Sequence, residues 1–115
     1  MMTEPGFNTL YEQTLMTVEG TVEEAIDSND VDIDFESVND ILTLTCPDGS
    51  SIIITRQSAT NQLWLAAKSG GFHFDFQNKR WVCDADGESL SDKLTSMCIQ
   101  QADVQLDFSA LDKLC

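Results

Sequence analysis

Carboxylate side chains form the most distinctive chemical pattern in this 115-residue chain. Two groups recur at regular spacing, every three or four residues in one segment and every second residue in the next. They are Glu19, Glu23, Glu24 and Asp27, then Asp32, Asp34 and Glu36. Carboxylate oxygens are hard ligands that suit Fe, Mn, Mg and Ca. Because the first 55 residues contain no Lys or Arg, we expect water, a cation or a basic partner to offset their mutual repulsion.

The same pattern predicts weak cation binding rather than a closed metal site. No D-x-[DN]-x-[DN]-G loop and no E-x-x-H motif brings several donors onto one ion. Carboxylates spread along a helix and a strand offer several shallow sites with few ligands each, so we expect binding to be multiple and poorly selective. Two further interpretations stay open: a solvated face that serves solubility, and a docking surface for a basic protein, which does not exclude metal.

Groups suited to catalysis are scarce in this sequence. His73 is the single histidine, and no G-x-S-x-G nucleophile motif is present. If the strands around His73 and Cys83 form a hairpin, these two side chains could come close, but an exposed strand histidine is the simpler interpretation. Gly70-Gly71 joins two strands with no helix after it, so it is not a phosphate-binding loop. We therefore expect no enzymatic activity of these types.

A second surface is predicted around Trp64. In the run Gln62-Leu63-Trp64-Leu65, strand alternation directs Trp64 outward with Gln62 if the leucines face the core. Arg56, Gln57 and Asn61 stand nearby in the sequence. An exposed Trp among Arg, Gln and Asn has the composition of an interface hot spot. The alternative is a buried Trp64 with the leucines directed outward.

Composition limits the classes of partner. The chain holds 20 acidic and 6 basic residues, a net charge of -14, and 42% hydrophobic residues, which predicts one folded domain over residues 1–115. Repulsion from phosphates and anionic lipids makes nucleic acids and membranes poor partners, and no apolar stretch reaches the roughly 20 residues that a bilayer requires. The N-terminus lacks the basic features of a signal or transit peptide, so we expect a cytoplasmic protein.

The four cysteines are widely spaced, without a C-x-x-C pair. They are Cys46, Cys83, Cys98 and Cys115. A zinc ribbon would bring its ligands as two close pairs. In a reducing cytoplasm we therefore expect free thiols in or near the core.

Residue periodicity predicts the elements that position these groups. Apolar spacing indicates a helix over about 7–27, after a flexible segment 1–6 that holds Pro5-Gly6. Six strands are predicted over 31–36, 41–46, 52–56, 62–67, 72–76 and 80–83. Ser89 can N-cap a second helix whose apolar stripe starts at Leu90. Short connections favour an antiparallel sheet, so we expect an α+β two-layer sandwich of the order α-β6-α, with both helices on one face.

Three runs of residues resemble the frataxin family in its bacterial form. They are Ser51–Gln57, Gln62–Asp75 and Trp81–Asp84, followed by Asp86-Gly87-Glu88. With the acidic helix and strand, the resemblance spans roughly residues 7–101. It implies the sandwich fold and a role in iron–sulfur cluster assembly. The implied protein binds Fe²⁺ or Fe³⁺ weakly at an acidic ridge and docks on a cysteine desulfurase and its scaffold protein.

The resemblance also assigns residues by position. The acidic ridge maps to Glu19, Glu23, Glu24, Asp27, Asp30, Asp32, Asp34 and Glu36. The partner-binding sheet surface maps to Arg56, Gln57, Trp64 and His73. In this family the C-terminal tail is thought to cover the groove between the helices, so we expect residues 103–115 to pack there through Leu106, Phe108 and Leu111.

The expected protein is a monomeric, iron-binding regulator of cluster assembly, and other divalent cations can share its ridge. Two alternatives stay open. One is an iron store or weak ferroxidase that oligomerises as iron loads. The other is a metal-free acidic inhibitor of a basic partner protein.

Overall fold

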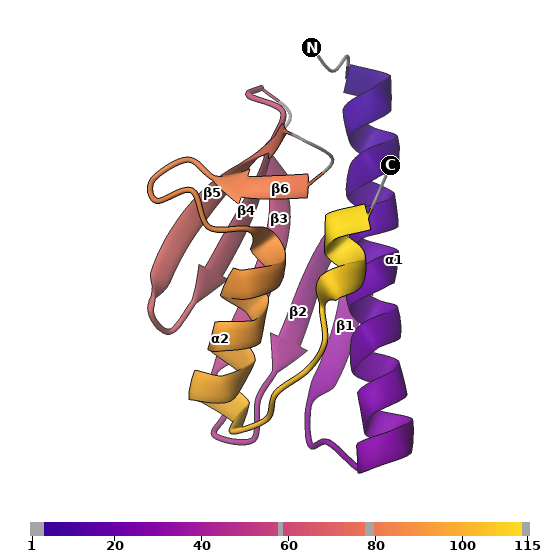
Figure 1. The fold of residues 1–115 in the computed structure, drawn as a ribbon. Helices are drawn as coiled ribbons and strands as arrows, with labels where there is room; N and C mark the ends of the chain where they lie inside the picture. Colours follow the sequence, from indigo (N-terminus) through magenta and orange to yellow (C-terminus); the bar gives the residue numbers. More distant parts are fainter. Residues whose placement is uncertain (1–3, 58, 78–79, 114–115) are drawn as a thin grey trace.

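Two long helices and a six-stranded sheet make up the chain, and the computed structural model describes residues 4–57, 59–77 and 80–113. The elements are α1 (Glu4–Asn29), β1 (Asp34–Val38), β2 (Ile41–Thr45), β3 (Ser51–Gln57), β4 (Gln62–Ala67), β5 (Gly70–Gln77), β6 (Arg80–Cys83), α2 (Leu90–Ala102) and the 3-10 helix η1 (Ser109–Lys113). The strands pair antiparallel in chain order. Both long helices cover one face of the sheet (Figure 1), which confirms the predicted α+β sandwich.

Helix α1 begins earlier than the sequence predicts. Pro5 and Gly6 lie in its first turn, and Phe7 is already fully buried. A proline is tolerated there because the first N–H groups of a helix have no intrahelical partner. The predicted start of the helix near residue 7 is therefore wrong, because residues 4–6 are already helical, and residues 1–3 lie outside the described part of the chain.

The alternation of acidic and apolar residues directs the side chains near β1 as predicted, although the strand covers 34–38 rather than 31–36. Ile33 is buried and Phe35 half-buried, whereas the alternating acidic residues are exposed. β1 forms one edge of the sheet. The residues before Asp34 have no paired neighbour in β2, because the pairing of the two strands starts with Asp34 opposite Thr45.

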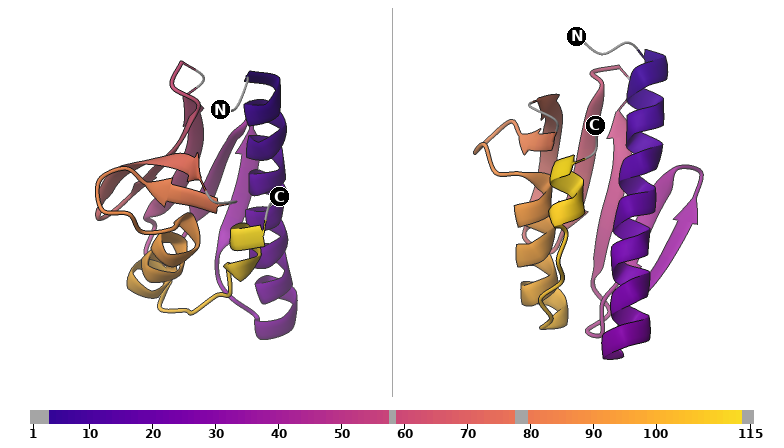
Figure 2. Two further views of the ribbon diagram at one scale, coloured as in Figure 1. Left: turned by 45° about the horizontal axis from the view of Figure 1, so that its top comes forward. Right: turned by 45° about the vertical axis from the view of Figure 1, so that its right-hand side comes forward.

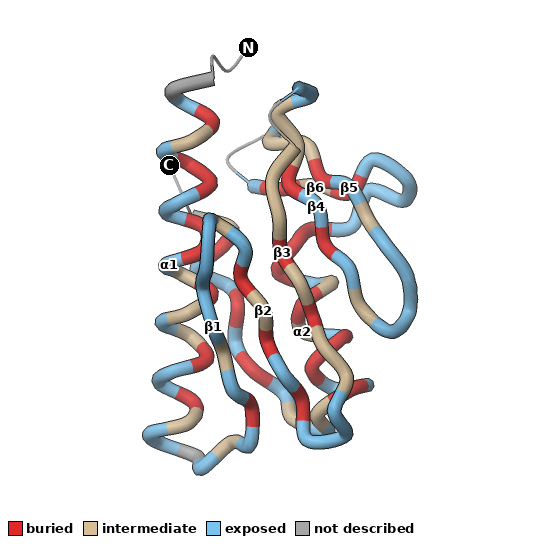
Figure 3. Tube along the Cα trace, turned by 180° about the vertical axis from the view of Figure 1, so that it is seen from behind, coloured by how far each residue is buried: buried red, intermediate tan, exposed pale blue. Residues whose placement is uncertain are grey.

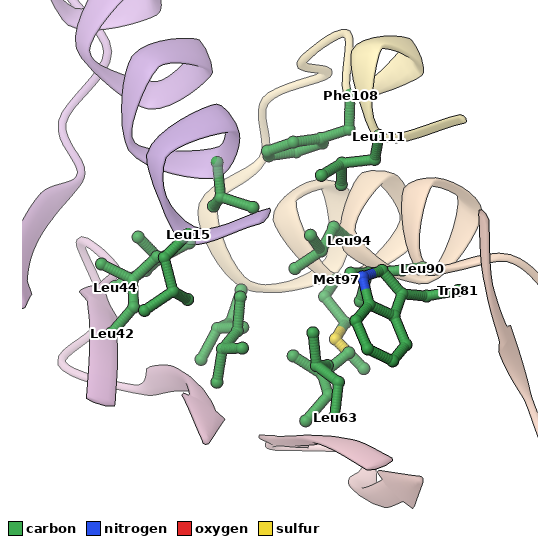
Figure 4. Packing of buried hydrophobic residues seen from close by; sticks show 14 of the residues in the cluster. Leu15, Leu42, Leu44, Leu63, Trp81, Leu90, Leu94, Met97, Phe108 and Leu111 are labelled. Atoms are coloured by element: carbon green, nitrogen blue, oxygen red, sulfur yellow. The ribbon is translucent and has the colours of Figure 1, made fainter. Parts of the chain in front are cut away.

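The helices and the sheet form two layers (Figure 2), and both layers contribute buried residues to one hydrophobic core. Alternate strand residues and the apolar stripes of both helices supply it, among them Leu15, Leu42, Leu44, Leu63, Trp81, Leu90, Leu94 and Met97 (Figure 4). The tail runs between α1 and α2 and buries Leu106, Phe108 and Leu111 against the core. Residues 114–115 of the predicted tail lie outside the described residues.

Two buried polar side chains connect distant elements. The indole Nε1 of Trp81 donates to Thr14 Oγ1 at 2.9 Å, which joins β6 to α1. Gln101 of α2 accepts from the backbone N–H of Lys68 at 2.9 Å and donates to Ser50 Oγ at 2.9 Å. Both side chains thereby find the partners that a buried polar group requires.

The start of α2 is fixed by its N-cap and by one lysine. Ser89 Oγ accepts a hydrogen bond from the backbone N–H of Asp92 at 3.1 Å, which confirms the predicted cap. Lys93 Nζ reaches back to Asp86 at 2.6 Å and to Glu88 at 2.9 Å. Its ammonium also lies 4.3 Å from the ring centroid of Phe72.

Three of the cysteines are free and buried, namely Cys46, Cys83 and Cys98. Burial raises the pKa of the Cys98 thiol to about 12 and also raises that of Cys46. The prediction for Cys115 falls outside the described residues. No helix in the described part of the chain has the length and apolar character needed to cross a bilayer.

Candidate metal and partner surfaces

The helical half of the acidic ridge lies along one solvent-facing side of α1. Glu19 is half-buried, and Glu23 and Asp27 are exposed. Their four-residue spacing aligns them along the helix axis. Glu24 differs, because one residue turns an α-helix by about 100°. It lines a hollow of about 420 Å³ between α1 and the tail, beside Asp107, and so lies apart from the other three.

The second half of the ridge follows the end of α1. Asp30 and Asp32 are exposed in the connection to β1. Asp34 and Glu36 lie on the open side of β1, each directly opposite a threonine of β2. β1 runs beside α1 (Figure 3), so the two halves of the ridge come from neighbouring elements, whereas Glu24 lines the hollow beside the tail.

The ridge is a dispersed set of hard oxygen donors. Within residues 4–57, 59–77 and 80–113, no three His, Cys, Asp or Glu side chains converge closely enough to hold a metal ion. In this part of the chain, the acidic partners of the ion pairs are Asp40, Asp48, Asp86 and Glu88. None of them belongs to the ridge. Exposed carboxylates of this kind fit hydrated hard cations through one or two donors each.

The open face of the sheet carries Trp64, whose outward direction is confirmed. Trp64 is 36% exposed, whereas Leu63 and Leu65 are 0% and 1% exposed. His73 lies directly opposite on β5, and the two rings stack with centroids 4.3 Å apart. A shallow hollow of about 100 Å³ adjoins them, with Ala66 and Gly71 among the residues that line it. Small side chains there leave room for one partner side chain.

Gln57 shares this open face, because it pairs with Gln62, two residues from Trp64 on the same side of β4. Gln62 Nε2 donates to Asp75 at 3.2 Å and to Asp84 at 3.1 Å. A polar group therefore adjoins the aromatic pair. This arrangement, apolar in the middle with polar surroundings, is typical of protein interfaces.

Arg56 does not join the other three predicted partner residues. Its guanidinium donates to Asn8 of α1 at 2.7 Å, pairs with Asp40 at 3.0 Å, and lies 5.9 Å from the ring centroid of Tyr11. The Tyr11 hydroxyl donates to the backbone oxygens of Asp40 and Ile54. Burial, reinforced by Asp40, raises the pKa of Tyr11 above its usual range.

Strand alternation could have predicted the direction of Arg56. It lies two residues after the buried Ile54, so both side chains leave β3 on the side that faces the helices. The resemblance assigned Arg56 and Gln57 to the same partner-binding surface, although neighbouring strand residues point to opposite faces.

The Cys83–His73 pairing considered from sequence does not form. Cys83 lies directly opposite Phe74 and is 3% exposed, so its thiol faces the core. His73 precedes Phe74 and points to the open face. The thiol and the imidazole therefore lie on opposite sides of the sheet.

Sequence reasoning missed two exposed apolar residues on the open face. Val38 and Ile41 are 52% and 42% exposed and pair with each other across the β1–β2 turn. Alternation with the buried Leu42 and Leu44 was the signal that could have identified Ile41. These residues bring apolar surface to the strands next to the acidic ridge.

Comparisons with known proteins agree with this architecture. A family model described as the frataxin-like domain matches residues 1–104. The iron-sulfur cluster assembly protein CyaY of Pseudomonas fluorescens is 42% identical over 112 residues, which is 96% of this chain and 98% of that protein. The CyaY protein of Azotobacter vinelandii is 38% identical over the same shares.

Two solved structures extend the comparison to three dimensions. Frataxin from Psychromonas ingrahamii has a TM-score of 0.85 at 29% identity, covering 93% of this chain and 98% of that one. Trimeric frataxin from the yeast Saccharomyces cerevisiae, described as complexed with ferrous iron, has a TM-score of 0.71 at 26% identity, covering 83% and 87%. The resemblance seen in the sequence is thus confirmed, and the chain belongs to the family of frataxin-like domains.

Proposed function

We propose that this chain serves in iron–sulfur cluster assembly as a non-enzymatic, iron-binding docking protein. The observation that supports this most strongly is the acidic ridge, in which exposed carboxylates come from the neighbouring elements α1 and β1 and from the connection between them. No Lys or Arg precedes Arg56 in the sequence, and Arg56 itself pairs with Asp40. Relatives named for iron–sulfur cluster assembly, 42% and 38% identical over nearly the whole chain, support the pathway.

The two surfaces suit two kinds of contact. The ridge carries clustered negative charge, so it fits a basic surface through steered, salt-sensitive association. We assign it to the cysteine desulfurase. The open face around Trp64 and His73 offers a stacked aromatic pair beside a hollow, which fits a contact made by shape and apolar area. We assign it to the scaffold protein.

Docking on the desulfurase is the direct test of the ridge. The variant Glu23→Gln/Asp27→Asn removes two ridge charges while keeping side-chain shape. We expect its dissociation constant for the desulfurase, measured by calorimetry, to rise roughly tenfold, and the wild-type affinity to fall steeply as salt increases.

A matched control changes net charge equally at another place. Ser96→Lys/Gln100→Lys also shifts the net charge by two units, but at exposed positions on α2. We expect this control to bind within about twofold of wild type, because distant surface charges are largely screened. Equal weakening in both variants, or affinity independent of salt, contradicts docking through the ridge.

Iron binding is tested separately on the isolated chain. We expect a titration with Fe²⁺, or with a diamagnetic divalent surrogate, to perturb backbone NMR signals at the end of α1 and along β1. Binding is expected to be weak because each ion meets only one or two carboxylates. Responses confined to the open face around Trp64 would show that the ridge is not the iron site.

Iron-dependent assembly is a second candidate function. The observation that favours it is the yeast relative described as trimeric and complexed with ferrous iron. It predicts that light scattering grows and Fe²⁺ oxidation accelerates under aerobic iron loading. This candidate is excluded if the chain stays monomeric and Fe²⁺ oxidises no faster with the protein than in buffer alone.

A further inference from the structure

One apolar side chain stands on the charged face of α1. Met16 is 69% exposed, the largest value among the exposed large hydrophobic residues of the described chain. It lies four residues after Glu12, three before Glu19 and seven before Glu23, so helical geometry places it on the same side as these carboxylates. Its thioether is therefore presented to solvent among acidic side chains, outside the core.

The other sulfur atoms of the described residues are shielded. Met97 is 2% exposed, and Cys46, Cys83 and Cys98 are 4%, 3% and 0% exposed. Burial also raises the pKa of the Cys46 and Cys98 thiols, which lowers the fraction of the reactive thiolate. Met16 is thus the accessible sulfur within residues 4–57, 59–77 and 80–113.

We propose that Met16 is a reversible oxidation site for peroxide, which changes the acidic face of α1 and leaves the core intact. The sulfur lone pair attacks one oxygen of hydrogen peroxide, so a sulfur–oxygen bond forms while the oxygen–oxygen bond breaks. The leaving hydroxide takes up the proton from the transferred oxygen and departs as water. Sulfur loses two electrons and the peroxide gains them.

The oxidation of Met16 can be reversed by thiols. A methionine sulfoxide reductase restores the thioether, two thiols supply the two electrons as they join in a disulfide, and the oxygen leaves as water. The modification changes a flexible apolar tip into a polar group with a hydrogen-bond acceptor. Since Met16 contributes no buried surface to the core cluster, the two forms differ at the surface of α1 alone. The proposal is independent of docking and of iron, because it is tested on the isolated chain.

The experiment follows oxidation residue by residue. The folded protein is treated with hydrogen peroxide, sampled over time and cleaved after glutamate, which isolates Met16 in the peptide Gln13–Glu19 and separates it from Met1 and Met2. Met97, in the C-terminal peptide that follows Glu88, serves as the buried comparator. A parallel reaction in urea gives the rate of each methionine in the unfolded chain.

We expect Met16 to oxidise in the folded protein at close to its unfolded rate, and Met97 at least roughly tenfold more slowly than Met16. The sulfoxide form should unfold at the same temperature as the untreated protein, as should Met16→Leu, and the two methionine sulfoxide reductases, one for each sulfoxide epimer, with dithiothreitol should together restore the original mass. Met16 oxidation no faster than that of Met97, a lower unfolding temperature of the Met16 sulfoxide, or a sulfoxide that the reductases cannot reach overturns the proposal.

Discussion

At the scale of single residues, Gln101 shows how one buried amide holds three segments together. Its side-chain oxygen accepts from the backbone of Lys68 in the β4–β5 turn, and its nitrogen donates to Ser50 beside β3. Gln101 is 5% exposed, and both of these hydrogen bonds are partly buried. Gln100, its neighbour on α2, is exposed.

Replacing this amide should therefore be costly. We expect Gln101→Leu to lower the free energy of unfolding by about 1–3 kcal/mol, because it leaves the Lys68 N–H without its partner. Gln100→Leu makes the same chemical change on the solvent side and should alter stability by about 0.5 kcal/mol or less. Urea unfolding of both variants measures the difference, and equal effects would contradict the role given to Gln101.

Asp48 makes the stability of the folded protein depend on pH. The hydroxyl and the backbone N–H of Ser50, with Lys68, hold the pKa of the Asp48 carboxyl at about 2, below its ordinary value of 3.8. Because the folded-state pKa is the lower one, the stabilisation is present above about pH 4 and is lost as the pH falls towards 2.

Asp48→Asn keeps the shape of this side chain and removes its titration. We expect the stability difference between wild type and this variant to be largest near neutral pH and to shrink from about pH 4 to pH 2. Asp32→Asn, which removes an exposed carboxylate in the connection between α1 and β1, controls for the overall change in charge. Acid titrations of urea unfolding compare the three proteins, and a difference that stays constant with pH rejects the assignment.

At the scale of elements, two neighbouring side chains of β3 point to opposite faces of the sheet and have different roles. Arg56 joins the strand to α1 through Asn8 and to the β1–β2 turn through Asp40. Gln57 points to the open face with Trp64. The cluster around Arg56 thereby joins the start of α1 to the turn that follows β1.

The different positions of Arg56 and Gln57 predict different effects for substitutions at these two adjacent residues. We expect Arg56→Ala to lower the free energy of unfolding by about 1–2 kcal/mol, a value reduced by the partial exposure of its ion pair. Gln57→Ala should leave stability within about 0.5 kcal/mol and weaken binding of the scaffold protein instead. Thermal unfolding together with binding measurements tests the pair, and destabilisation by Gln57→Ala equal to that by Arg56→Ala would contradict it.

At the scale of the whole molecule, the net charge is -14, and part of it comes from carboxylates that lie close enough along α1 to repel one another. Glu19, Glu23 and Asp27 form like-charge pairs at four-residue spacing, and each such pair costs a helix about 0.2–0.5 kcal/mol. Retaining these pairs lowers stability, which is expected at a surface selected for binding rather than for folding.

Removing ridge charge should therefore stabilise the isolated chain. We expect Glu23→Gln/Asp27→Asn, the variant that weakens docking, to raise the free energy of unfolding by roughly 1 kcal/mol in low salt. The gain should vanish near 1 M salt, where charges more than about 3 Å apart are screened. A gain that persists in high salt would trace to another cause, such as helix propensity.

The sequence predicted those features that depend on neighbouring residues. Strand alternation anticipated the outward Trp64 and the bounds of β4 and β6, and the capping pattern located Ser89 before α2. Contacts between distant segments escaped it. The bond from Arg56 to Asn8 spans 48 positions, and periodicity carries no information about such a pairing.

The candidate surfaces show the same limit. Helical geometry alone separates Glu24 from Glu23 by about 100°, so that separation could be predicted, whereas the hollow that Glu24 lines depends on the tail that packs beside it. The metal-binding role of the ridge and the partner-binding role of Gln57, Trp64 and His73 stay predictions, because the fold shows where these groups lie and not what they hold.

The position of β1 at the sheet edge has a consequence for self-association. An edge strand presents unpaired backbone groups that can recruit a strand from another molecule, and charged side chains on the edge oppose this. Asp34 and Glu36 supply that opposition, next to the exposed Val38. Cations that neutralise these two carboxylates would remove the barrier, so the surface proposed to bind metal would also decide whether two molecules can join their sheets.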